Sequence, residues 1–233
     1  WPHGAFSAVA CAGPMTRGVR DAALMFSAMA RFDLRDPVCL PDEKRDWRDG
    51  IEDGVKGVRV AIVRRFGFEP PLDPEGEAAL RLAATLLMEA GAIVEEADPD
   101  MPDARAIFSR VWGVAMARTW NATPVEKRPL LDAGIEEVAR SMGGISASDF
   151  LAADMLRVEC GHAMARFHQR HDLILTACTP TAAFEADAPT VKPVESLWRD
   201  WAPWTFAFNL TRQPAISVPV GLDSEGMPRA VQV

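Results

Sequence analysis

Apolar side chains near the start of the chain recur at the spacing of an amphipathic helix. They follow Thr16, at Val19, Ala22, Ala23, Phe26, Met29 and Ala30. Pro14 disfavours a helical conformation at Gly13, so the chain is expected to stay extended up to this point. The hydroxyl of Thr16 is expected to cap the first turn. The pattern therefore predicts a helix of about four turns that starts directly after Thr16.

After residue 57 the pattern changes to strand, helix and strand. Val58–Val63 is a short β-branched run with little alternation, which is typical of a strand buried on both faces. Asp73 and Pro74 provide a capping residue and a first-turn proline for a helix that Gly91 ends. Residues 93–94 then return as a strand. Together these elements predict a right-handed βαβ unit.

The rest of the chain adds a helical layer and further strands. Helical spacing predominates over about 103–171, and apolar runs at 172–178, 215–220 and 229–233 predict strands, the last two paired with each other. The elements together predict an α/β fold, a mixed β-sheet covered by helices. We expect residues 1–233 to form a single portion of one domain.

Composition narrows the range of partners. The formal net charge is −8 at pH 7 and the pI is about 5.1. A surface that binds nucleic acid or an anionic membrane needs clustered positive charge, so both partners are disfavoured. We expect a neutral or cationic small molecule instead, with no cofactor and no metal. A homo-oligomer remains an open alternative.

The cysteines and the apolar runs bear on the compartment. Cys11, Cys39, Cys160 and Cys178 are widely spaced, with no CxxC pair, and we expect no secretory leader. No run approaches the roughly 20 apolar residues that a membrane helix needs. We therefore expect a cytoplasmic protein without a membrane span.

Three stretches carry motifs in a fixed order. Gly13–Arg17 is Gly-Pro-Met-Thr-Arg, residues 172–180 contain Asp-Leu-Ile-Leu-Thr and then Thr-Pro, and residues 209–221 contain Asn-Leu-Thr and then Gln-Pro-Ala-Ile-Ser-Val-Pro-Val-Gly. Together they resemble the segment that follows the catalytic core in amidase signature hydrolases. The resemblance implies an amidase-signature-like fold. We expect this fold to be the C-terminal portion of an amidase domain, incomplete at both ends.

The resemblance also implies a reaction. Members of this family hydrolyse amides with a serine nucleophile, a second serine held by a cis peptide bond, and a lysine, and both serines lie in a Gly/Ser-rich stretch upstream of Gly-Pro-Met-Thr-Arg. Only twelve residues precede Gly13, and they contain neither that stretch nor a lysine. We therefore expect no catalytic residue here, a small-molecule amide as the substrate of the full-length protein, and no turnover by this chain alone.

Five residues are expected to line the substrate pocket: Met15, Thr16, Cys178, Trp204 and Phe208. Cys178 stands at the carboxyl end of a predicted strand, where ligands collect in open α/β sheets. The two aromatic residues belong to a dense cluster that also contains Trp198, Trp201 and Phe206. Two interpretations of this cluster stay open. Its rings close the core against the sheet, as aromatic rings more often do, or Trp204 and Phe208 wall the pocket.

Other candidate chemistry is disfavoured by geometry or context. A zinc site at Cys160, His168 and His171 is unfavourable because Cys160 and His168 lie about 12 Å apart along a helix, which leaves only the two histidines able to chelate together. Ser146 follows two glycines, yet a helix cap explains it better than a nucleophile. Cys178 lacks a recognisable base, so a small buried residue is preferred to a thiol nucleophile.

Two positions depart from the family pattern. Arg212 stands where the family usually has glycine, and Ala177 where proline is common. A bulky cation at position 212 is expected to narrow the site or to recruit an acidic substrate.

Two other functions stay open beside the amidase. One is a non-catalytic binding or assembly domain on the same fold. The other is an amidotransferase-type subunit, which resembles the same family but acts on a charged tRNA with partner proteins. The acidic charge argues against direct tRNA contact.

Overall fold

The computed structural model describes residues 6, 9–36, 39–43, 45–186 and 202–233. Residues 1–54 belong to one compact unit and residues 55–233 to another, and each unit is described by itself. That the whole chain is a single portion of one domain stays a prediction. Trp198 and Trp201 of the predicted aromatic cluster lie outside the described residues.

The first unit contains the helix α1 (Val19–Met29), whose 11 residues make about three turns. Its N-cap residue is Gly18 and no side chain caps it, so the prediction that Thr16 caps this helix is wrong. The Thr16 hydroxyl instead donates to the Gly18 carbonyl at 2.9 Å, because Thr16 lies two residues before the N-cap position. Phe26 packs edge-on against Trp47, with ring centroids 4.9 Å apart, and this contact ties α1 to the loop that follows.

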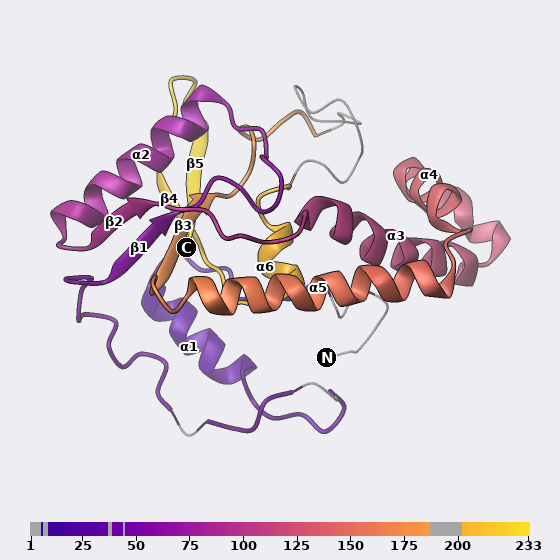
Figure 1. Ribbon diagram of the computed structural model, residues 1–233, viewed down its shortest axis with the longest axis horizontal. Coiled ribbons are helices and arrows are strands. Elements are labelled where there is room, and N and C mark those ends of the chain that lie inside the picture. Colours follow the sequence, from indigo (N-terminus) through magenta and orange to yellow (C-terminus); the bar gives the residue numbers. More distant parts are fainter. Residues whose placement is uncertain (1–5, 7–8, 37–38, 44, 187–201) are drawn as a thin grey trace. The chain divides into compact units, whose positions relative to one another are not determined.

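The second unit is built around a five-stranded sheet (Figure 1). Its strands lie in the order β2-β1-β3-β5-β4, with bounds Arg59–Ile62 (β1), Ile93–Glu96 (β2), Leu173–Ala177 (β3), Ser217–Leu222 (β4) and Pro228–Gln232 (β5). β1 pairs in parallel with β2 and β3, whereas β5 is antiparallel to β3 and β4. The sheet is therefore mixed, which confirms the predicted fold class.

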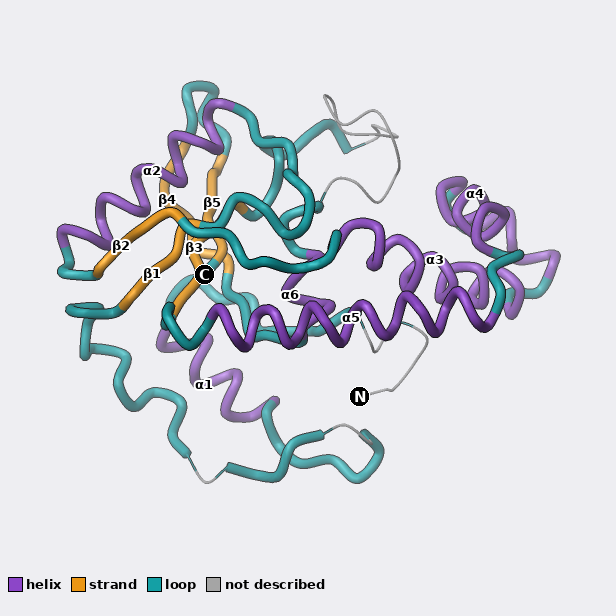
Figure 2. The backbone as a smooth tube through the Cα atoms, viewed as in Figure 1, coloured by secondary structure: helices purple, strands orange, loops and turns teal. Residues whose placement is uncertain are grey.

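The helix α2 (Pro74–Glu89) packs on one face of the sheet (Figure 2). Asp73 caps it by accepting a hydrogen bond from Gly76 N at 2.7 Å, and Pro74 occupies the first turn, as predicted. One apolar cluster joins helix and strands: Val60, Leu80, Ala83, Ala84, Ala92, Leu175 and Val231. Because side chains alternate along a strand, the neighbours of these strand residues point to the opposite face.

Helices fill most of the segment between β2 and β3 (Figure 2). They are α3 (Ala104–Ala122), the 3-10 helix η1 (Val125–Leu130), α4 (Ala133–Met142) and α5 (Ala147–Phe167), and the short α6 (Phe206–Thr211) follows later. Ser146 caps α5 by accepting a hydrogen bond from Asp149 N at 3.1 Å, which confirms its interpretation as a cap. Within the described part of the chain, no helix combines the length and the apolar character needed to cross a membrane.

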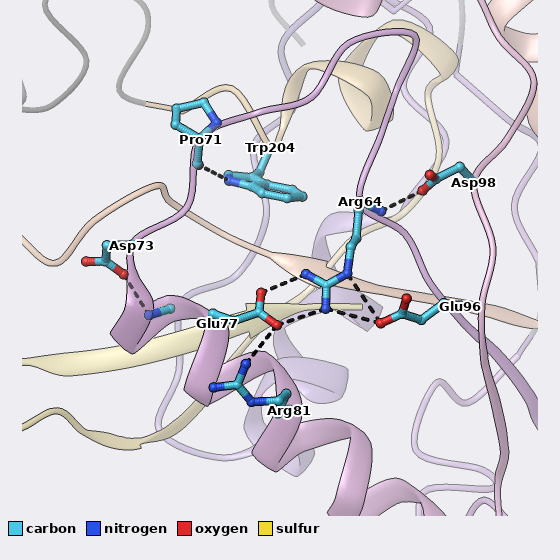
Figure 3. A network of polar contacts seen from close by, with 9 residues as sticks. Arg64, Pro71, Asp73, Glu77, Arg81, Glu96, Asp98 and Trp204 are labelled. Atoms are coloured by element: carbon cyan, nitrogen blue, oxygen red, sulfur yellow. Dashed lines mark hydrogen bonds and ion pairs between the residues drawn. The ribbon is translucent and has the colours of Figure 1, made fainter.

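Ion pairs join β1, α2 and β2 where β1 ends (Figure 3). Arg64 donates to the two carboxylate oxygens of Glu77 at 2.7 and 2.9 Å, and to Glu96 at 3.3 Å. Asp98 accepts a hydrogen bond from the backbone N–H of Arg64 at 2.7 Å. The hydrogen bonds from Arg64 lower the pKa of the Glu77 carboxyl group. The network fixes the start of α2 against the carboxyl end of β1.

Candidate functional site

The parallel strands β1 and β3 end at the same edge of the sheet, where ligands of open α/β sheets usually bind. Cys178 directly follows β3 at this edge. Its thiol lies 3.3 Å from Ser217 Oγ, so the structure brings together residues from β4 and from the end of β3. Burial raises the pKa of the Cys178 thiol, which opposes formation of a thiolate nucleophile. Cys178 is half-buried, and its raised thiol pKa disfavours the thiol nucleophile.

A row of polar side chains crosses the sheet beside Cys178. Thr176 on β3 pairs with Gln232 on β5, and Gln232 pairs with Ser217 on β4. Residues that pair directly across strands lie on the same face, so these three side chains form one row. Leu175 and Val231 belong to the cluster under α2, and the row therefore lies on the opposite face of the sheet. We call Thr176, Gln232 and Ser217 the polar row.

Trp204 and Phe208 are buried, with 2% and 6% of their surface exposed. Both rings contact Phe66 edge-on, with centroid distances of 6.4 and 5.5 Å. The indole N–H of Trp204 donates to the carbonyl of Pro71 at 3.0 Å (Figure 3). These contacts favour the interpretation in which the rings close the core. Their place in the wall of a pocket stays a prediction.

Trp204 also connects the core to the polar row. The side-chain amide of Gln232 donates to the Trp204 carbonyl at 3.3 Å. Because this hydrogen bond uses the main-chain carbonyl of Trp204, it does not depend on the indole ring.

Met15 and Thr16 belong to the first unit, and Met15 is 94% exposed there. An exposed methionine offers a flexible apolar surface that adapts to many ligands. The predicted part of both residues in substrate binding stays a prediction.

The structure also contains a cavity of about 340 Å³ that the sequence did not indicate. Its lining comes from the start of α2, the segment after β3 and the β4–β5 turn, and consists of Asp73, Glu75, Thr181, Ala182, Ala183, Phe184, Asp223, Ser224, Glu225 and Arg229. Arg229 donates to both carboxylate oxygens of Asp73 at 3.1 and 2.9 Å, and to Asp223 at 2.9 Å. A backbone hydrogen bond from Met227, and then the one from Arg229, lower the pKa of Asp223. Arg229 thus neutralises Asp73 and Asp223, whereas Glu75 accepts a hydrogen bond from the Ser224 hydroxyl and adds, with Glu225, negative charge to the lining.

The cysteine and histidines that suggested zinc have other contacts. Cys160 is buried, and burial raises the pKa of its thiol to about 11. His171 Nε2 lies 2.8 Å from Glu95, and His168 Nδ1 lies 3.0 Å from the carbonyl of His171. Among the described residues, no group of three or more His, Cys, Asp or Glu side chains is arranged to hold a metal ion.

The position of Arg212 gives a physical reason for the glycine that is usual there. Arg212 follows α6 with φ 58° and ψ 32°, the left-handed conformation. Glycine adopts this conformation without the steric cost that a Cβ atom brings, and it commonly ends helices in this way. Conformation therefore gives a physical reason to expect glycine at this position. The effect of Arg212 on substrate choice stays a prediction.

Comparison with known proteins places these features in a family. Residues 3–233 match the family Amidase. The chain is 31% identical over 225 residues to an amidase of Pseudomonas putida, a match that covers 94% of this chain and 48% of the relative. It is 30% identical over 248 residues to a glutamyl-tRNA(Gln) amidotransferase subunit from Rhodospirillum rubrum, covering 95% and 49%.

The fold agrees with the sequence match. The crystal structure of a bacterial aryl acylamidase of the amidase signature family superposes with a TM-score of 0.81 at 24% identity, covering 94% of this chain and 48% of that one. The chain thus spans about half the length of the relatives it matches. The match over residues 3–233 and the shared fold show that the chain belongs to the amidase family, that of the amidase signature enzymes.

Proposed function

We propose that this chain is part of an amidase that hydrolyses a carboxylic amide to an acid and ammonia or an amine. The family match over residues 3–233 carries the proposal. An amidase from Pseudomonas putida and an acylamidase from Rhodococcus erythropolis, 31% and 28% identical to the chain, support an amide as the substrate. We propose that the enzyme acts on a small molecule in the cytoplasm.

The chain by itself is proposed to be inactive, because among the residues that the structure describes no serine or cysteine near the site is activated. Attack by a hydroxyl or thiol at neutral pH needs a base that removes the proton. Ser217 Oγ lies against the Cys178 thiol, whose pKa is raised by burial, and a protonated thiol is no base. Ser146 is occupied as the cap of α5. The chain therefore supplies binding surface and scaffold.

In the first unit, Met15 and Thr16 are proposed to contact the substrate. In the second unit, the proposed binding surface includes Cys178. Trp204 and Phe208 support it from behind, since their rings are buried against Phe66. In this arrangement the aromatic side chains hold the end of β3 and the polar row in place.

The assay measures the release of ammonia and amines from simple amides and anilides. It compares this chain with a longer protein that also contains the residues encoded upstream in the native gene. We expect release by the extended protein only. Hydrolysis by the 233-residue chain would contradict the proposed inactivity, and Cys178→Ala and Ser217→Ala would then locate the nucleophile. Absence of hydrolysis by both the 233-residue chain and the extended protein would contradict the proposed amidase activity.

One alternative has support among the relatives. The glutamyl-tRNA(Gln) amidotransferase subunit from Rhodospirillum rubrum is 30% identical to the chain, so a protein that works with partner proteins is the second candidate. The net charge of −8 disfavours direct contact with tRNA by this chain. Copurification of the extended protein with partner proteins, together with amide hydrolysis only in their presence, would favour this candidate.

A further inference from the structure

His171 is a buried histidine whose two ring nitrogens both face hydrogen-bond acceptors. It lies between the end of α5 and the start of β3, and 2% of its surface is exposed. Its Nε2 atom lies 2.8 Å from the Glu95 carboxylate, and its Nδ1 atom lies 3.3 Å from the carbonyl oxygen of Phe167. The Phe167 ring packs against the imidazole, with ring centroids 4.3 Å apart. The imidazole is therefore held between a helix end and a strand.

The chemistry of these two contacts depends on the protonation state of the ring. A neutral imidazole carries a hydrogen on one of its two nitrogens, whereas the imidazolium ion carries one on each. A carbonyl oxygen and an ionised carboxylate can only accept hydrogen bonds. The neutral ring therefore donates to Glu95 or to Phe167, and its other nitrogen then points a lone pair at an oxygen atom. Only the imidazolium ion donates to both acceptors.

The contact with Glu95 crosses the sheet. Glu95 on β2 and Ile174 on β3 both pair with Ala61 on β1, which lies between them. Because the side chain of Ala61 is small, it leaves room for the Glu95 carboxylate to reach His171 at the start of β3. β2 is the outermost strand on its side of the described sheet. The contact therefore fastens an edge strand to the segment that joins α5 to β3.

The charged and titratable groups around the ring come from several elements. They are Glu95 on β2, Asp172 next to His171, Arg59 on β1, and His168, Arg166 and Arg170 at the end of α5. Hydrogen bonds from Arg59, and to a smaller extent the charge of His171, hold the pKa of the Asp172 carboxyl group well below its usual range. Two carboxylates and the carbonyl end of α5 favour a positive ring, whereas burial and the arginines oppose it. The opposing effects leave the ring able to gain or lose its proton, as histidines do near neutral pH.

We propose that His171 is a proton-dependent clamp on the edge strand β2. The protonated ring donates to both Glu95 and the Phe167 carbonyl and thereby ties β2 to the end of α5. When the ring loses its proton, one of these two hydrogen bonds is lost. The unfolded ring makes neither bond, so the extra stabilisation is present at low pH and is lost as the pH rises. The Glu95 side chain is 66% exposed, which gives solvent protons a route to the contact.

The first test compares the full-length native protein with His171→Gln by urea denaturation at about pH 6 and about pH 8.5. Glutamine retains a donor for Glu95 but does not titrate. We expect the unfolding equilibrium constant of the wild type, relative to that of His171→Gln, to rise about tenfold between the two pH values, as for one lost charge-assisted hydrogen bond. His162→Gln is the control, because His162 is exposed and lies 3.7 Å from Glu159 at the surface of α5. Its ratio should change less than about twofold.

A second variant keeps the inference testable if His171→Gln does not fold. Glu95→Gln alters an exposed side chain and leaves the histidine in place. Hydrogen exchange of the β2 amide groups, corrected for intrinsic exchange rates, measures how firmly the strand is held. Protection in the wild type should fall about tenfold from pH 6 to pH 8.5, and that in Glu95→Gln should change less than about twofold. Equal pH dependence of β2 protection in the wild type and Glu95→Gln would overturn the clamp, because the ring would then serve the fold without its proton.

Discussion

Arg229 on the last strand holds Asp73, the residue that caps α2. Their two hydrogen bonds, Nη1 to Oδ1 at 3.1 Å and Nη2 to Oδ2 at 2.9 Å, join positions 156 residues apart. Asp73 Oδ1 also accepts a hydrogen bond from the backbone N–H of Gly76. The same carboxylate therefore caps α2 and binds the arginine of β5. The bidentate geometry makes this contact specific for arginine.

Arg229→Ala should be strongly destabilising. The Arg229 side chain is 11% exposed, and its removal leaves two carboxylates without their cation, so we expect a loss of about 3 kcal/mol in the free energy of unfolding. Urea denaturation of the full-length protein measures this loss. Arg140→Ala is the control, because its i,i+4 pair with Glu136 is exposed and should contribute less than about 0.5 kcal/mol. Equal effects of the two variants would contradict the structural role of Arg229.

The ion pair of Arg64 with Glu77 should make stability depend on acid pH. Hydrogen bonds from Arg64 lower the pKa of folded Glu77 from its ordinary value of 4.5. The unfolded chain then binds a proton more readily, so the stabilisation is fully present above about pH 5.5 and is lost as the pH falls through the folded pKa. Glu77→Gln should flatten this part of the stability–pH curve, measured by urea denaturation. Glu89→Gln, an exposed position on the same helix, should leave the curve unchanged, and similar curves for wild type and Glu77→Gln would contradict the prediction.

Local sequence signals predicted the elements well. The cap and the proline of α2 lie next to each other in the chain, and β1 and β3 are short apolar runs whose pattern needs no distant partner. The start of α1 was missed because Thr16 and Gly18 are both acceptable N-cap residues, and local propensity does not decide between them.

The contacts of the candidate site could not be predicted from local sequence patterns. Cys178 was found because it follows a strand, but its contact with Ser217 spans 39 residues and depends on strand register. The polar row of Thr176, Gln232 and Ser217 is visible only when the strands are paired. Arg229 and Asp73 are ordinary charged residues in the sequence, and only the fold makes them partners.

Arg212→Gly should stabilise the protein. The left-handed backbone at φ 58° costs about 1 kcal/mol for a residue with a Cβ atom, and glycine removes that cost. Denaturant midpoints of the full-length variants measure the gain. Arg212→Ala keeps the Cβ atom and should give no such gain. If Arg212→Gly is no more stable than Arg212→Ala, conformation does not explain the position.

Gly67 should not tolerate a side chain. Its φ is +75°, and a Cβ atom would lie 2.3 Å from the Pro102 carbonyl oxygen, so Gly67→Ala should cost about 3 kcal/mol. Gly161 in α5 offers the opposite case, because nothing lies within 4 Å of its Cβ position. Gly161→Ala should stabilise the protein by about 0.5–1 kcal/mol. Thermal and urea denaturation measure the change in the free energy of unfolding for both variants. If Gly67→Ala is stabilising like Gly161→Ala, the close packing around Gly67 is contradicted.

Trp204 should matter for stability more than for direct substrate contact. Trp204→Phe keeps an aromatic ring but removes the indole N–H, and the Pro71 carbonyl then loses its donor. We expect a loss of about 1–2 kcal/mol in the free energy of unfolding, measured by urea denaturation of the full-length protein. Well below the melting temperature, KM should change less than about twofold, since the ring lies behind the proposed site.

Phe208→Leu tests the second ring that packs on Phe66. Phe208 lies in α6 and Trp204 in the segment before it. The substitution removes aromatic volume without any hydrogen bond, so we expect a similar loss of stability and again little change in KM. A large rise in KM with unchanged stability in either variant would place that ring in the pocket wall. The two measurements together therefore decide between the two interpretations that the aromatic cluster allowed.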